Sequence, residues 1–139
     1  MASFVYDNAK ELIADGTIDL EGHVLRLALL SASHTPDKAN HTQFSNVSAN
    51  EIAGSGYTAG GEVVLSVAVS RSGAVVKVDA PDVEWAALAP DFRYVVLYDD
   101  TAVGDPLIAL LDPAALQQPG GQDTKVVFHA SGIFTLTDA

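Results

Sequence analysis

The sequence predicts a mainly β protein with one α-helix near its N-terminus. Apolar residues recur at helical spacing between residues 3 and 15, and from residue 17 onward they form short runs separated by turn residues. The 139 residues are typical of one domain, and 48% hydrophobic residues can supply a core without disulfides. We therefore expect a single β-sandwich or barrel-like domain over residues 1–139, with an N-terminal helix at 1–16 and a β-domain at 17–139.

The N-terminal helix is expected over residues 3–15. Ser3 is suited to cap its start, because a serine side chain accepts a hydrogen bond from the first free backbone amides. Gly16 is suited to end it. The apolar positions at helical spacing are Val5, Ala9, Leu12 and Ile13. Such an amphipathic helix has to pack on another surface, either the sheet of the same chain or a neighbouring subunit.

Strands are expected next at residues 23–30, 62–70 and 74–79. The first becomes wholly apolar toward its end, which indicates a central strand buried on both faces. The second alternates, with Val63, Leu65, Val67 and Val69 on one face, as in a half-buried strand. Residues 71–73 predict a hairpin turn into the third. Val83 and Trp85 then share a face and are expected to anchor the core or an interface.

The remaining strands are expected at residues 92–98 and 107–111, joined by an acidic turn at 99–105, and in a last region at 124–130 and 133–137 with a bend at Ser131-Gly132. Two connections, 34–56 and 112–123, are long and rich in turn residues, and the first includes a short helical turn at 50–52. Loops of this length in a small domain are usually functional or interface segments.

Charge and composition exclude several classes of partner. The chain has 7 basic and 18 acidic residues, and its net charge of −11 is spread over both halves. Nucleic-acid binding requires clustered Lys and Arg, so no nucleic-acid partner is expected. No apolar run approaches the ~20 residues of a membrane-spanning helix and no export signal is visible, so no membrane partner is expected. The absence of cysteine excludes thiolate chemistry.

No sequence pattern indicates catalysis, a cofactor or a metal site. The serine motif of α/β-hydrolases is absent, and the glycine-rich segment 54–61 has no following lysine or helix that would bind phosphate. Acidic turns such as 99–105 are expected to hydrogen-bond backbone amides, with a structural Ca²⁺ as the alternative. The histidines are His23, His34, His41 and His129, of which His34 and His41 share a polar loop and are expected to be solvated. We expect a protein that is not an enzyme.

Several segments together resemble a family of small tailed-bacteriophage virion proteins. The most specific are Gly-Tyr-Thr-Ala-Gly-Gly at 56–61 and Asp-Val-Glu-Trp at 82–85. The resemblance covers nearly the whole chain and includes residues 8–10, 16, 29–31, 35–37, 41, 50–61, 79–85, 93–99 and 106–109. It breaks down at 112–123, where the family has a Gly/Ser-rich loop and this chain has Pro113-Ala114-Ala115-Leu116. The family supplies no catalytic residues.

The resemblance implies a non-enzymatic structural component of a virion, made in the cytoplasm of the host bacterium. The leading expectation is a capsid decoration (cement) protein that binds the outer head lattice. Its partners would be the major capsid protein or other virion proteins, and copies of itself. The alternatives are a tail or baseplate protein and a carbohydrate-binding module on the virion surface. The low aromatic content, 7% of residues, counts against a sugar-binding cleft.

Contacts with the particle or with sister copies are expected through segments that are irregular and low in charge, because interface centres exclude charge and use aromatic anchors. These segments are residues 34–61 and 114–122, together with the apolar face of the helix. The candidate anchors are Phe4, Tyr6, Phe44, Tyr57 and Leu116. For Phe4 and Tyr6 the alternative is that they pack as core against their own sheet.

Overall fold

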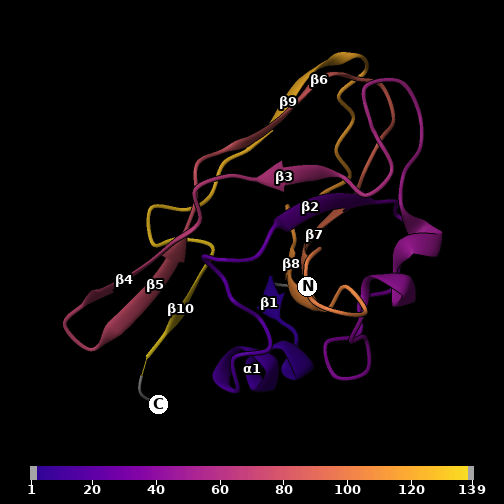
Figure 1. Ribbon diagram of the computed structural model, residues 1–139. Helices are drawn as coiled ribbons and strands as arrows, with labels where there is room; N and C mark the ends of the chain where they lie inside the picture. The colour runs from indigo at the N-terminus through magenta and orange to yellow at the C-terminus, as the bar shows by residue number, and fades with distance from the viewer. Residues whose placement is uncertain (1–2, 138–139) are drawn as a thin grey trace.

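A five-stranded antiparallel sheet forms the centre of the fold (Figure 1). The computed structural model describes residues 3–137. Along this sheet the strands are β1 (Phe4–Val5), β8 (Leu107–Leu111), β7 (Tyr94–Asp99), β2 (Leu25–Leu30) and β3 (Glu62–Val64). Leucine and valine side chains of β2 and β7 are buried on both faces of the sheet. The buried strand expected at 23–30 is therefore confirmed, although it begins at Leu25.

Two smaller antiparallel sheets flank the central one (Figure 1). One contains β4 (Ala68–Ser72), β5 (Val75–Asp79) and β10 (Phe134–Leu136), and the other pairs β6 (Val83–Leu88) with β9 (Gln122–Val126). The β4–β5 hairpin extends from one side of the molecule, and every residue of β4 is exposed. With 39% strand and 10% helix, the mainly β class is confirmed, and none of the described sheets closes into a barrel.

The helix α1 (Asp7–Ala14) begins later than expected. Residues 4–5 form β1 instead and pair with the edge of β8, whose backbone groups would otherwise lack a partner strand. Ser3 does not cap the helix. Its Oγ accepts a hydrogen bond from the Asp112 N–H at 2.8 Å, so long-range sheet pairing outweighs the local capping preference.

The end of α1 agrees with the sequence. Gly16 has a φ of +86°, a conformation that glycine adopts without strain, and its N–H donates to the carbonyl of Ile13. Ala9 is fully buried, and the helix contacts β8. Of the two packing partners left open by the sequence, α1 therefore uses the sheet of its own chain.

Two segments expected to be single strand regions are divided between sheets. The expected strand 62–70 becomes β3, which pairs with β2, and β4, which pairs with β5. Between them Ser66 has a φ of +52°, which interrupts the extended backbone. The expected inward face is consequently wrong, since Val64 is buried and Leu65 is 67% exposed. The last region is divided in the same way into β9 and β10, on either side of the expected bend at Gly132.

The turns agree with the sequence more closely. A hairpin turn joins β4 to β5 as expected, but it lies at 73–74, because residues 71 and 72 still belong to β4; Gly73 has a φ of +61°. The acidic segment 99–105 joins β7 to β8. The long connection 34–56 contains two 3-10 turns, η1 (Phe44–Asn46) and η2 (Ser48–Asn50), the second of which ends where the helical turn at 50–52 is expected.

Candidate functional site

The glycine-rich segment 51–61 is bound to the fold by its own polar groups. Glu51 Oε2 accepts hydrogen bonds from the Tyr57 hydroxyl and from the Gly60 N–H, the latter at 2.7 Å. The Tyr57 hydroxyl also accepts a hydrogen bond from the Leu29 N–H of β2 at 3.1 Å. Burial and the Glu51 carboxylate raise the pKa of Tyr57 well above its usual range. Tyr57, a candidate contact residue, is thus held by its own chain.

The same segment approaches two strands so closely that glycine is required. Gly61 has a φ of +81°, and a Cβ there would lie 1.8 Å from the carbonyl oxygen of Leu27 in β2. A Cβ on Gly56 would lie 2.4 Å from the carbonyl oxygen of Ala87 in β6. We call residues 51–61 the strap, because they contact both β2 and β6 and so bridge the two strands. The motif at 56–61, on which the resemblance rests, therefore has a structural role: it allows the strap to pack closely on the two strands.

The other candidate contact residues differ in exposure. Tyr6 is fully buried, and the partly buried Phe4 packs edge-to-face against it with ring centroids 5.0 Å apart. The core alternative therefore holds for Tyr6. Phe44 stacks on Tyr98 with centroids 4.2 Å apart and is partly buried. Leu116, in the 112–121 loop, is 44% exposed and is the candidate most accessible to a partner.

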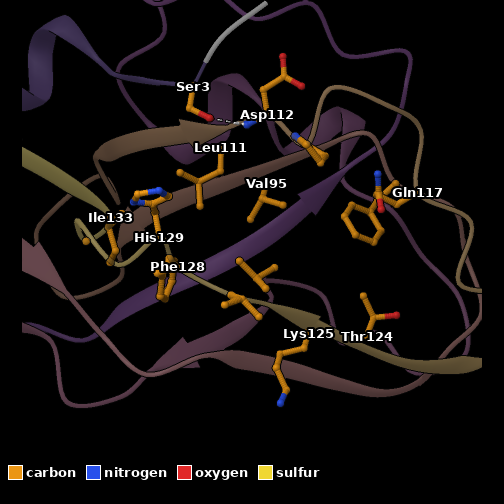
Figure 2. Close-up of a pocket in the computed structure, with 15 residues that line it drawn as sticks. Ser3, Val95, Leu111, Asp112, Gln117, Thr124, Lys125, Phe128, His129 and Ile133 are labelled. Carbon is orange, nitrogen blue, oxygen red and sulfur yellow. Dashed lines mark hydrogen bonds between the residues drawn. The ribbon is translucent and has the colours of Figure 1, made fainter.

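An apolar groove of about 450 Å³ lies between the central sheet and a wall formed by β9 and the segment that follows it (Figure 2). Figure 2 shows Val95 and Leu111 of the central sheet on one side and Thr124, Lys125 and Phe128 on the other. The apolar lining residues are Phe92, Val95, Leu111, Val126, Phe128 and Ile133, and Val127 is 67% exposed at the opening. Three further pockets in the described part of the chain are smaller, with volumes of about 200, 380 and 250 Å³.

One side of the groove is the edge of β9. Residues 124–126 of β9 and residues 127–128 beyond its end all line the groove. Because successive side chains of a strand point to opposite faces, three consecutive lining residues within β9 indicate contact along the strand edge. Within residues 3–137, β9 pairs with β6 alone. An open strand edge beside an apolar groove is the arrangement that accepts an extended segment of another polypeptide.

A buried ion pair holds the other end of the groove. The Asp112 side chain is fully buried and pairs with the Arg93 guanidinium, and its Oδ1 accepts the Ala114 N–H at 2.7 Å. Burial opposes ionisation of Asp112, but these partners outweigh it and lower the pKa of the carboxyl below its usual value. Asp112 is therefore a charged anchor for the 112–121 loop.

The histidines and acidic turns are used structurally. His34 is only 4% exposed, so its expected solvation is wrong: the loop folds it against Tyr94, 5.8 Å away between ring centroids, and His41, 5.6 Å away. In the acidic turn, Asp99 is buried, pairs with His23 and accepts backbone N–H groups two and three residues ahead. Among residues 3–137 no group of three or more His, Asp or Glu side chains is placed to hold a metal ion.

Acid is expected to destabilise the protein through His34. Burial lowers the pKa of His34 below the value of about 6.5 that it has in an unfolded chain, so the folded state binds fewer protons in this range. The contribution of neutral His34 is complete above about pH 6.5 and is lost as the pH falls below it. Urea unfolding at a series of pH values measures this. His34→Gln should reduce the loss, the exposed control His129→Gln should not, and equal slopes would contradict the expectation.

Comparison of the chain with protein-family models, with curated proteins and with solved structures found no match. Within residues 3–137 no helix is long and apolar enough to cross a membrane. The function is therefore inferred from the residues and geometry of this chain.

Sequence reasoning missed the groove. Its walls come from β7, β8, β9 and the 127–133 segment, which are distant along the chain and belong to different sheets. The available signal was the apolar run Val126-Val127-Phe128 close to the bend at Gly132, which looked like one continuous strand. The expected contact segment 114–122 does border the groove, through Gln117.

Proposed function

We propose that the protein is a non-enzymatic structural component of a tailed-phage virion, a decoration protein that binds the outer head lattice. The family resemblance of the sequence supports the virion assignment. The residues that carry this resemblance, in the strap and around Trp85, are occupied in packing and in hydrogen bonds within the chain. Because these residues are used within the chain, contacts with partners would be made by other, exposed residues.

The open groove beside β9 is the observation on which the proposed binding rests. An extended segment of the capsid protein would add to the β9 edge through backbone hydrogen bonds and place alternate apolar side chains in the groove. Leu116 and Val127, exposed by 44% and 67%, would be covered by this partner. The groove also borders the 112–121 loop, where the sequence departs from the family pattern. This loop would make contacts that are specific to the capsid protein of the particle to which this chain binds.

The number of copies of the protein in the heads and in the tails of particles tests whether it is a head protein. Heads and tails of purified particles are separated, and the protein is quantified by mass spectrometry against the major capsid protein. We expect it in the head fraction, in numbers comparable to those of the capsid protein. A few copies confined to tails would favour the tail or baseplate alternative, and absence from particles would contradict the proposal.

A matched pair of variants tests the groove. Val127→Glu places a charge at the groove, whereas Leu65→Glu places one at a site that is equally exposed, 67%, outside it. Binding of each purified protein to heads that lack it is measured by sedimentation. We expect Val127→Glu to weaken binding at least about tenfold, a loss of about 1.4 kcal/mol. Leu65→Glu should bind like the wild type, and both should keep its melting temperature. Equal binding of the two variants would contradict the groove assignment.

A further inference from the structure

Apart from Leu65, between β3 and β4, the exposed large apolar residues in the described part of the chain fall in three places. Leu116 and Val127 lie by the groove already described. Val69 and Val75 lie on the β4–β5 hairpin, beside Leu136 of β10. Val24 and Val103 lie at the β7–β8 turn, where the Asp100 N–H donates to the Val24 carbonyl at 2.8 Å. The second and third places have opposite charge.

The β4–β5 hairpin, residues 68–79, is a projection that we call the arm, and its outer part carries the positive charge of Arg71. No acidic residue occurs between residues 63 and 78, whereas Arg71 and Lys77 are two of the seven basic residues of a chain with eighteen acidic ones. The Arg71 guanidinium donates to the carbonyl of Gly73, and Lys77 lies 3.8 Å from Asp79. β4 is an edge strand with all five residues exposed, and near its base the Val69 N–H donates to the Glu21 carboxylate at 3.0 Å.

The β7–β8 turn, residues 99–105, has an excess of negative charge. It contains Asp99, Asp100 and Asp105, and Arg26 is the fixed positive charge that pairs with it, through Asp100. Burial raises the pKa of Asp105 above its usual value, and the nearby carboxylates of Asp100 and Asp99 raise it further. Val103, at the end of the turn, is fully exposed.

We propose that the arm of one copy of this chain binds the β7–β8 turn of a second copy. Arg71 and Lys77 complement the acidic turn, and Val69 and Val75 cover Val103. The arm and the turn lie at separate places on one molecule (Figure 1). Each copy therefore donates an arm and receives another, and this head-to-tail contact generates a ring or an open chain. The inference does not depend on the virion assignment.

Light scattering of the purified protein over a range of concentrations tests the contact. We expect a mass above the 14.5 kDa of one chain at low salt. The association constant should fall at least about tenfold between 0.1 M and 1 M NaCl, as the screening length falls from about 10 Å to about 3 Å. A single-chain mass at every concentration would overturn the proposal.

Charge variants identify the surfaces. The double variant Arg71→Glu, Lys77→Glu and the single variant Val103→Lys should each reduce the mass to that of one chain. The control Lys10→Glu, Lys38→Glu makes the same change in net charge at exposed positions outside the groove, the arm and the turn, and should still associate. Circular dichroism establishes that each variant is folded, which is expected because Arg71 and Val103 are exposed. Association of the arm variant at the wild-type level would overturn the proposal.

Mixing the arm variant with the turn variant, each of which is expected to be monomeric alone, tests the pairing of arm and turn most directly. The intact arm of Val103→Lys can bind the intact turn of Arg71→Glu, Lys77→Glu, but neither variant can extend the assembly. We expect a one-to-one dimer in native mass spectrometry. A mixture that contains single chains alone would show that the contact does not join the arm to the turn, and would overturn the inference.

Discussion

Replacing Gly61 with alanine is expected to destabilise the folded protein severely. The φ of +81° is strained for alanine, and the added Cβ would lie 1.8 Å from the Leu27 carbonyl oxygen, within the backbone of the central strand β2. Neither β2 nor the strap can move without breaking the sheet. We expect a loss above about 4 kcal/mol, which is a large share of the total stability of a typical domain, about 5–15 kcal/mol.

Gly120→Ala is the matched control for this prediction. Gly120 also has a positive φ, +61°, but a Cβ there would meet no atom within 4 Å. It therefore measures the backbone strain alone, about 1–2 kcal/mol. Urea unfolding followed by circular dichroism compares the two variants with the wild type. Similar losses for Gly61→Ala and Gly120→Ala would mean that the close approach of the strap to β2 contributes nothing.

Replacing Trp85 with alanine is expected to cost about 3–5 kcal/mol, because it removes a large buried side chain and leaves a cavity. Trp85 is 1% exposed and is the largest of the fully buried side chains in the described chain. It lies on β6, the strand with which β9 pairs. The loss should therefore loosen β9, and with it one side of the groove.

Urea unfolding measures the loss of stability, and amide hydrogen exchange locates it. We expect faster exchange in β9 of Trp85→Ala than in β2, and weaker binding to heads than for the wild type. Trp85→Phe keeps most of the buried volume and should lose less on both measures. Uniform exchange throughout the chain would show that Trp85 stabilises the whole domain and not the β6–β9 pair in particular.

Sequence patterns located the elements that depend on neighbours along the chain. Short apolar runs marked β2 and β7, and positive-φ glycines ended α1 at Gly16 and turned the chain at Gly73. Leu107–Leu111 formed the strand expected from its apolar run. Such features follow from local sterics and from the burial of one short segment, so the order of residues is sufficient to predict them.

Features that depend on distant partners were decided by the tertiary structure. β1 replaced the first turn of the expected helix because β8 offered a free edge, and His34 was buried because its loop folded onto Tyr94. The expected strand 62–70 was divided because its two halves found partners in different sheets. The groove beside β9 has the same origin. A segment's local preference amounts to a fraction of a kcal/mol per residue, about 0–1, and long-range pairing and burial are strong enough to override it.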